Sequence, residues 1–89
     1  MTTKRPESLV AALKAAGMTD TLDQFLGEIC TGPERADIEL RWRLMGMLAD
    51  GIPQRTIAER LGVSLCKITR GSRIVKNKKS VSYRMLNTL

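Results

Sequence analysis

The sequence predicts an all-α fold, and two observations indicate it. Apolar residues make up 43% of the 89 residues, but there is only one Trp, one Tyr and one Phe. A core built mainly of Leu, Ile, Met and Ala suits helices better than sheets, which are enriched in aromatic and β-branched residues. Apolar residues also recur at helical spacing, and no stretch shows the alternation of a strand. A chain of this length predicts one domain with a modest core.

The N-terminal end is predicted to be a flexible basic arm over residues 1–6, followed by a single helical domain over residues 7–89. Residues 7–16, with the sequence ESLVAALKAA, favour a helix. Gly17 follows this stretch, and we expect it to end the helix because glycine is the commonest residue just past a helix C-terminus.

Caps and apolar faces predict the next two helices. Thr19 or Thr21 can cap the first. Its apolar stripe is Leu22, Phe25, Leu26 and Ile29. Thr31 with Glu34 three residues later is a capping-box signature, which opens a long helix over residues 33–49. The apolar residues of this long helix fall on two faces, Ile38, Trp42, Met45 and Leu48 on one and Leu40, Leu44 and Met47 on the other. A helix apolar on two faces is buried on both, so we expect a second copy to cover one face in a homodimer.

Residues 53–77 are predicted to form a helix-turn-helix, two short helices that cross steeply after a tight turn. Gly62 permits the left-handed conformation of the turn, and Ser64 caps the second helix. The positions that must be apolar are Ile57, Leu61, Val63 and Ile68. Ala58 is small where the helices approach closely, and Ser80 opens a last short helix. A plain helical hairpin is the alternative interpretation of this pattern.

Charge is unevenly distributed along the chain. Residues 1–51 have a net charge of −2, whereas residues 52–89 have +8. Such asymmetry indicates a polyanionic partner for the second half, either nucleic acid or an anionic surface. In a helix-turn-helix, the outward side of the second helix reads base edges in the major groove of double-stranded DNA. The residues predicted to contact DNA are Gln54, Arg55, Ser64, Leu65, Cys66, Lys67, Thr69, Arg73 and Lys76.

Several function classes are disfavoured. With no His and no cluster of Cys, we expect no metal site, and Cys30 and Cys66 are interpreted as free thiols of a cytoplasmic protein. No apolar run approaches the ~20 residues of a membrane span. We expect no enzyme activity, because there is no His, Gly-rich phosphate loop or paired-carboxylate pattern.

Longer motifs go beyond a general helix-turn-helix. The run KITRGSRIVK, together with PQRTIAERLGVS, RWRLMGML and CTGPER upstream, resembles the tryptophan repressor family over about residues 22–77. The resemblance implies an intertwined all-helical homodimer that represses transcription by binding an operator. It also implies that L-tryptophan acts as a co-repressor, bound between the dimer core and the helix-turn-helix.

The resemblance assigns ligand roles to particular residues. Arg41 and Arg70 would enclose the indole and add positive charge near the carboxylate, and Gly71 would leave room beside the ring. Thr31, from the second chain, would contact the ligand, and main-chain carbonyls would receive its ammonium group. The assigned residues are therefore Arg41, Arg70, Thr31, Gly71, Cys30 and Glu28.

Three positions depart from the family. Arg41 takes the family's arginine position only if the turn at residues 51–53 is one residue shorter, since otherwise Leu40 takes it. Ile74 stands where a serine helps to hold the ligand's amino group, and Glu28 replaces an apolar residue near the ammonium.

Each ligand residue also has a purely structural interpretation. Thr31 can serve its capping box alone, Arg41 can balance acidic residues of its own helix, and Gly71 can serve close helix packing. Arg70 can be a phosphate contact. The alternative functions are a ligand-independent regulator with the same fold and a basic module that binds nucleic acid non-specifically.

Overall fold

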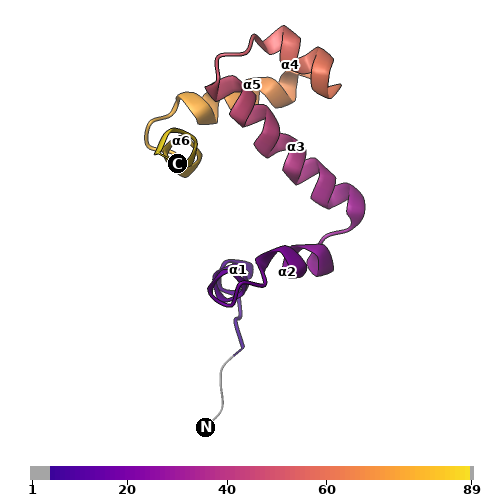
Figure 1. Ribbon diagram of the computed structural model, residues 1–89, viewed down its shortest axis with the longest axis vertical. Helices are drawn as coiled ribbons and strands as arrows, with labels where there is room; N and C mark the ends of the chain where they lie inside the picture. Colours follow the sequence, from indigo (N-terminus) through magenta and orange to yellow (C-terminus); the bar gives the residue numbers. More distant parts are fainter. Residues whose placement is uncertain (1–4, 89) are drawn as a thin grey trace. The chain divides into compact units, whose positions relative to one another are not determined.

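The computed structural model describes residues 5–88, so the first four residues of the expected basic arm lie outside it. Over this range the chain forms helices and no strand, as predicted (Figure 1). The helices are α1 (Leu9–Met18), α2 (Leu22–Ile29), α3 (Gly32–Ala49), α4 (Gln54–Leu61), α5 (Leu65–Lys76) and α6 (Val81–Thr88). The chain divides into two compact units, an N-terminal unit up to Ala36 and a C-terminal unit from Asp37 onward.

The first helix shows where a prediction from glycine was wrong. Ser8 caps α1, because its Oγ accepts a hydrogen bond of 3.0 Å from the backbone N–H of Ala11. The helix does not stop at Gly17 but continues through it to Met18. The chain instead turns at Asp20, which has a φ of 59°. Asp is among the few residues other than glycine that adopt this left-handed conformation readily, which explains why the turn needs no glycine.

The caps of α2 and α3 differ in chemistry. Thr21 is at the cap position of α2, as one of the two predicted alternatives, but its hydroxyl donates to the carbonyl of Ala16 at 3.4 Å instead of capping the helix. The predicted capping box of α3 is confirmed. The N–H of Thr31 donates to Glu34 Oε1 at 2.8 Å, and the N–H of Glu34 donates to Thr31 Oγ1 at 3.3 Å.

The core of the C-terminal unit takes one residue from each of three helices. Leu44 of α3, Ile57 of α4 and Ile68 of α5 are at most 1% exposed. These positions confirm the apolar pattern predicted for the two short helices. Other apolar side chains pack against this cluster, namely Met45, Met47, Leu48, Ile52, Ala58, Leu61 and Val63.

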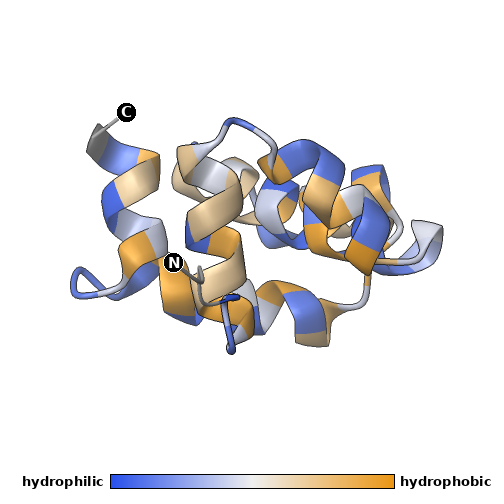
Figure 2. Ribbon diagram, turned by 90° about the horizontal axis from the view of Figure 1, so that it is seen from below, coloured by the Kyte–Doolittle hydropathy of each residue, from blue (hydrophilic) through white to orange (hydrophobic). Residues whose placement is uncertain are grey.

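This core therefore takes residues from both predicted faces of α3. Met45 and Leu48 pack against the core with Met47, whereas Ile38 and Trp42 are 51% and 43% exposed. In Figure 2, hydrophobic and hydrophilic residues are intermingled along the helices. The exposed large hydrophobic residues are Leu9, Val10, Met18, Leu22, Ile29, Ile38, Trp42, Leu65, Val81 and Met85.

The connections of the C-terminal unit follow the predicted turn chemistry. Gly62 has a φ of 63°, and its N–H donates to the carbonyl of Ala58 at 2.9 Å. Ser64 caps α5 by accepting a hydrogen bond from the N–H of Lys67 at 3.4 Å. Ser80 accepts a hydrogen bond of 3.0 Å from the N–H of Tyr83 and so caps α6. None of the helices within residues 5–88 has the length and apolar character needed to cross a membrane.

Candidate functional site

A cavity of about 490 Å³ lies between α3 and α5 in the C-terminal unit. Its walls have two kinds of side chain, cationic and apolar. From α3 the lining residues are Arg41, Leu44 and Met45, and from α5 they are Lys67, Arg70, Gly71 and Ile74. The volume is in the usual range for small-molecule sites.

Gly71 allows α5 to approach α3 closely. A Cβ placed on Gly71 would lie 2.5 Å from Leu44 Cδ1 and 3.4 Å from Leu48 Cδ1. Gly71 is buried, and its backbone forms part of the cavity wall. The packing role that the sequence left open for Gly71 is therefore real, and the same glycine lines the cavity.

Three cations and one carboxylate determine the electrostatics of the cavity. Arg41, Lys67 and Arg70 line it. Asp37 bridges two of them, because its Oδ2 lies 2.8 Å from Arg41 Nη2 and its Oδ1 lies 3.0 Å from Lys67 Nζ. The hydrogen bond from Lys67 is the main reason that the pKa of Asp37 is lowered, and the positive charges of Arg41 and Lys67 act in the same direction.

The structure brings together three of the six ligand residues expected from the sequence. Arg41, Arg70 and Gly71 line one cavity. Leu40, the alternative to Arg41, is not among the residues that line this cavity. Ile74 contributes an aliphatic wall and no hydroxyl group.

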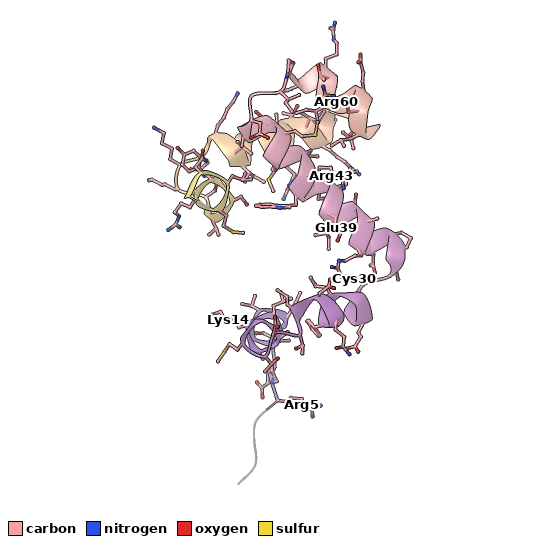
Figure 3. The ribbon with its side chains drawn as sticks, viewed as in Figure 1. Arg5, Lys14, Cys30, Glu39, Arg43 and Arg60 are labelled. Atoms are coloured by element: carbon pink, nitrogen blue, oxygen red, sulfur yellow. The ribbon has the colours of Figure 1, made fainter. Side chains whose placement is uncertain are left out.

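The other three ligand residues belong to the N-terminal unit. Thr31 forms the capping box described above. Cys30 follows α2 as its C-cap and is a partly buried free thiol (Figure 3). Glu28 lines a separate open hollow of about 300 Å³ with Ala16, Thr21, Gln24 and Phe25.

The residues predicted to contact DNA are mainly at the surface of α4 and α5. Leu65 is 61% exposed in the single chain. The hydroxyl of Thr69 donates to the carbonyl of Leu65 at 2.9 Å and keeps its acceptor capacity. The other exposed members of the set are Gln54, Arg55, Ser64, Cys66, Lys67, Arg73 and Lys76.

Lys67 has a position that sequence reasoning missed. Although Lys67 is exposed, its ammonium pairs with Asp37 and it lines the cavity. Asp37 and Arg41 are four residues apart on one helix, so their pairing was among the possibilities that the sequence raised. The contact between Asp37 and Lys67 joins residues 30 positions apart, and no local pattern indicates it.

The fold and the cavity define a class of small helical proteins. In this class, a pocket lined by both cationic and apolar side chains lies beside a helix that follows a tight turn. The chain matches the family described as Trp repressor protein over residues 4–89, and it belongs to that family, whose members are DNA-binding transcription repressors.

Curated relatives carry the name Trp operon repressor homolog. One from Haemophilus influenzae is 37% identical over 65 residues, which are 72% of this chain and 64% of that protein. Another, from Chlamydia trachomatis, is 46% identical over 44 residues, which are 48% of this chain and 47% of that protein. The chain thus matches less than two thirds of the length of either relative. No solved structure matches the chain significantly.

Proposed function

We propose that this protein is a sequence-specific transcriptional repressor that acts as a homodimer in the cytoplasm and is activated by L-tryptophan. The observation that carries the proposal is that Arg41 and Arg70, from two different helices, line one cavity whose remaining walls are mainly apolar. The helix that supplies Arg70 also presents exposed polar and basic residues on its other sides.

The cavity suits a flat apolar ring with a carboxylate. Leu44, Met45 and Ile74 supply apolar contact. An indole between two guanidinium groups gains about 0.5–2 kcal/mol from each desolvated cation–π contact. The same arginines attract the ligand's carboxylate. In the proposed dimer, Thr31 and the carbonyls near Glu28 and Cys30 of a second copy complete the site around the ammonium group.

In this proposal, α4 and α5 form the helix-turn-helix, with the N-terminal part of α5 directed at base edges. Leu65 and Cys66 contact apolar groups such as a thymine methyl, and Thr69 forms hydrogen bonds with bases. Arg73 contacts guanine or phosphate. The residues that hold the DNA backbone are Arg55, Lys67 and Lys76, with Lys78 and Lys79 beyond the end of α5. Gln54 and Ser64 also contact DNA.

Helix α5 is what couples ligand to operator. Thr69 and Arg70 are consecutive, so their side chains point about 100° apart around the helix. Both are exposed, and of the two only Arg70 lines the cavity. A ligand that contacts Arg41 and Arg70 together fixes the position of α5 against α3, and with it the orientation of the DNA-contacting residues.

The decisive experiment measures operator binding with and without millimolar L-tryptophan. Arg70→Leu is expected to abolish the dependence on L-tryptophan while the protein stays folded and dimeric. Lys76→Ala, the matched control on the same helix, is expected to weaken DNA binding but to keep the ratio of affinities with and without ligand. Equal binding by the wild-type protein in both conditions would refute the co-repressor role.

Sequence readout has a test of its own. Thr69→Ala is expected to change which sequences are preferred, whereas Lys79→Ala is expected to weaken binding to all sequences alike. Uniform losses in both variants would contradict the assignment of the outward face of α5. Competition between one specific duplex and bulk DNA at matched salt distinguishes the proposal from non-specific binding.

A second candidate function is a ligand-independent repressor of the same fold. Ile74 favours it, because an aliphatic side chain cannot hydrogen-bond to the amino group of an amino acid. Calorimetry with L-tryptophan separates the two functions, since the ligand-independent repressor gives no heat of binding.

A further inference from the structure

Asp37 pairs with two of the three cationic side chains that line the cavity. It lies one helical turn before Arg41 on α3, and it reaches across to Lys67 on α5. Each carboxylate oxygen has its own partner, at 2.8 Å for Arg41 Nη2 and 3.0 Å for Lys67 Nζ. Of the three cations that line the cavity, only Arg70 is not paired with Asp37.

We propose that Asp37 is a tethered competitor of the ligand, a carboxylate that holds Arg41 and Lys67 until the carboxylate of an incoming anion takes its place. This inference rests on the proposed function, in that it assumes an apolar anion as ligand. The inference makes Asp37 a specificity-determining residue, which contacts the cations of the cavity but not the ligand.

Electrostatics makes the competition unavoidable. A ligand carboxylate that approaches Arg41 meets a guanidinium already paired with Asp37, and two carboxylates that share one cation repel each other. Asp37 is attached to the same helix as Arg41, so its local concentration is far above that of any dissolved ligand. Because its pKa is lowered, Asp37 is ionised at neutral pH and competes throughout the physiological range.

Exposure limits the size of the effect. The side chains of Asp37, Arg41 and Lys67 are 36%, 59% and 43% exposed, so solvent screens both pairs. Exposed ion pairs are weak, and removing the competitor should therefore tighten binding of an anionic ligand only about two- to five-fold. A ligand without a carboxylate should gain nothing.

The test is calorimetry of three ligands with three variants and the wild-type protein. The ligands are L-tryptophan, indole-3-propionate, which lacks the amino group, and indole, which lacks both charges. Asp37→Asn removes the competing charge, and Asp37→Glu keeps it. Asp50→Asn is the matched control, because it removes the same charge from an exposed position just past the other end of α3.

We expect Asp37→Asn to bind both carboxylates more tightly and indole unchanged. Asp37→Glu and Asp50→Asn should resemble the wild-type protein. Equal affinities of wild type and Asp37→Asn for both carboxylates would overturn the inference while leaving the proposed function intact. Weaker binding of L-tryptophan alone by Asp37→Asn would also overturn it, by showing that Asp37 receives the ligand's ammonium. If no variant binds any of the three ligands, the proposed ligand response fails, and the inference fails with it.

Discussion

Replacing Gly71 by alanine tests whether close packing of α5 on α3 is required for stability. The added Cβ would lie 2.5 Å from Leu44 Cδ1, whereas carbon atoms in good contact are ~3.5–4.0 Å apart. Leu44 is 1% exposed, so its side chain must shift to admit the new atom, and the cavity that it lines is where it can move. Over-packing of this kind costs about 1–3 kcal/mol, and the better helix propensity of alanine returns about 0.5–1 kcal/mol. We therefore expect Gly71→Ala to lower the free energy of unfolding by up to about 2.5 kcal/mol.

Urea unfolding at one fixed protein concentration measures this difference, because the stability of an oligomer depends on concentration. Gly46→Ala is the matched control. Gly46 also lies inside a helix, but a Cβ there meets no other atom within 4 Å. This control should gain about 0.5–1 kcal/mol from helix propensity. If Gly71→Ala is as stable as Gly46→Ala, then α5 does not need the glycine to approach α3, and the reasoning is refuted.

Four further predictions concern the cap, its pH dependence, the assembly and the DNA. Thr31→Ala removes the hydroxyl that accepts a hydrogen bond from the N–H of Glu34. Urea unfolding should show that the free energy of unfolding falls by about 0.5–2 kcal/mol, whereas a variant outside the cap should show no loss. Hydrogen bonds from Thr31 lower the pKa of Glu34 below its ordinary 4.5. The stability that the ionised Glu34 carboxylate adds to the folded state is therefore complete above pH 4.5 and is lost as the pH falls through the folded-state pKa. The wild-type protein should accordingly have a higher free energy of unfolding than Glu34→Gln at neutral pH but not in acid. A difference that persists in acid would contradict the cap. Sedimentation should find a dimer at micromolar concentration, because hydrophobic side chains such as Ile38 and Trp42 are exposed in one chain; a stable monomer would exclude this. If about 6–10 phosphates are contacted, operator affinity should fall ~10³–10⁵-fold between 50 and 200 mM salt, and a flat response would mean that the basic half does not face DNA.

Local patterns were enough to predict much of the fold. The capping box of Thr31 and Glu34, the turn at Gly62 and the buried positions Ile57 and Ile68 all follow from interactions within a few residues. Gly17 was misjudged, because a glycine inside a helix costs only about 1 kcal/mol and its presence does not force the helix to end.

The candidate site was only partly predictable, since it combines local and distant contacts. Arg41 and Arg70 came from family resemblance, and the structure places both on one cavity. The pairing of Lys67 with Asp37 depends on how α5 packs against α3, and no spacing in the sequence encodes it. The close contact between Gly71 and Leu44 is likewise a property of two helices together, and the sequence could offer it only as one of two interpretations.

The small core has a consequence for how mutations in this protein act in the cell. Within residues 5–88 the buried hydrophobic side chains are Ala16, Leu44, Ile57 and Ile68, so we expect a separated chain to have a thin margin of stability. In the proposed dimer we expect a separated subunit to be only marginally stable, so finished dimers should exchange subunits slowly. A defective copy therefore combines with normal chains mainly while both are newly made. Variants that fold but do not bind DNA should be dominant when they are synthesised together with the wild-type chain, and nearly harmless when they are added to dimers that have already formed.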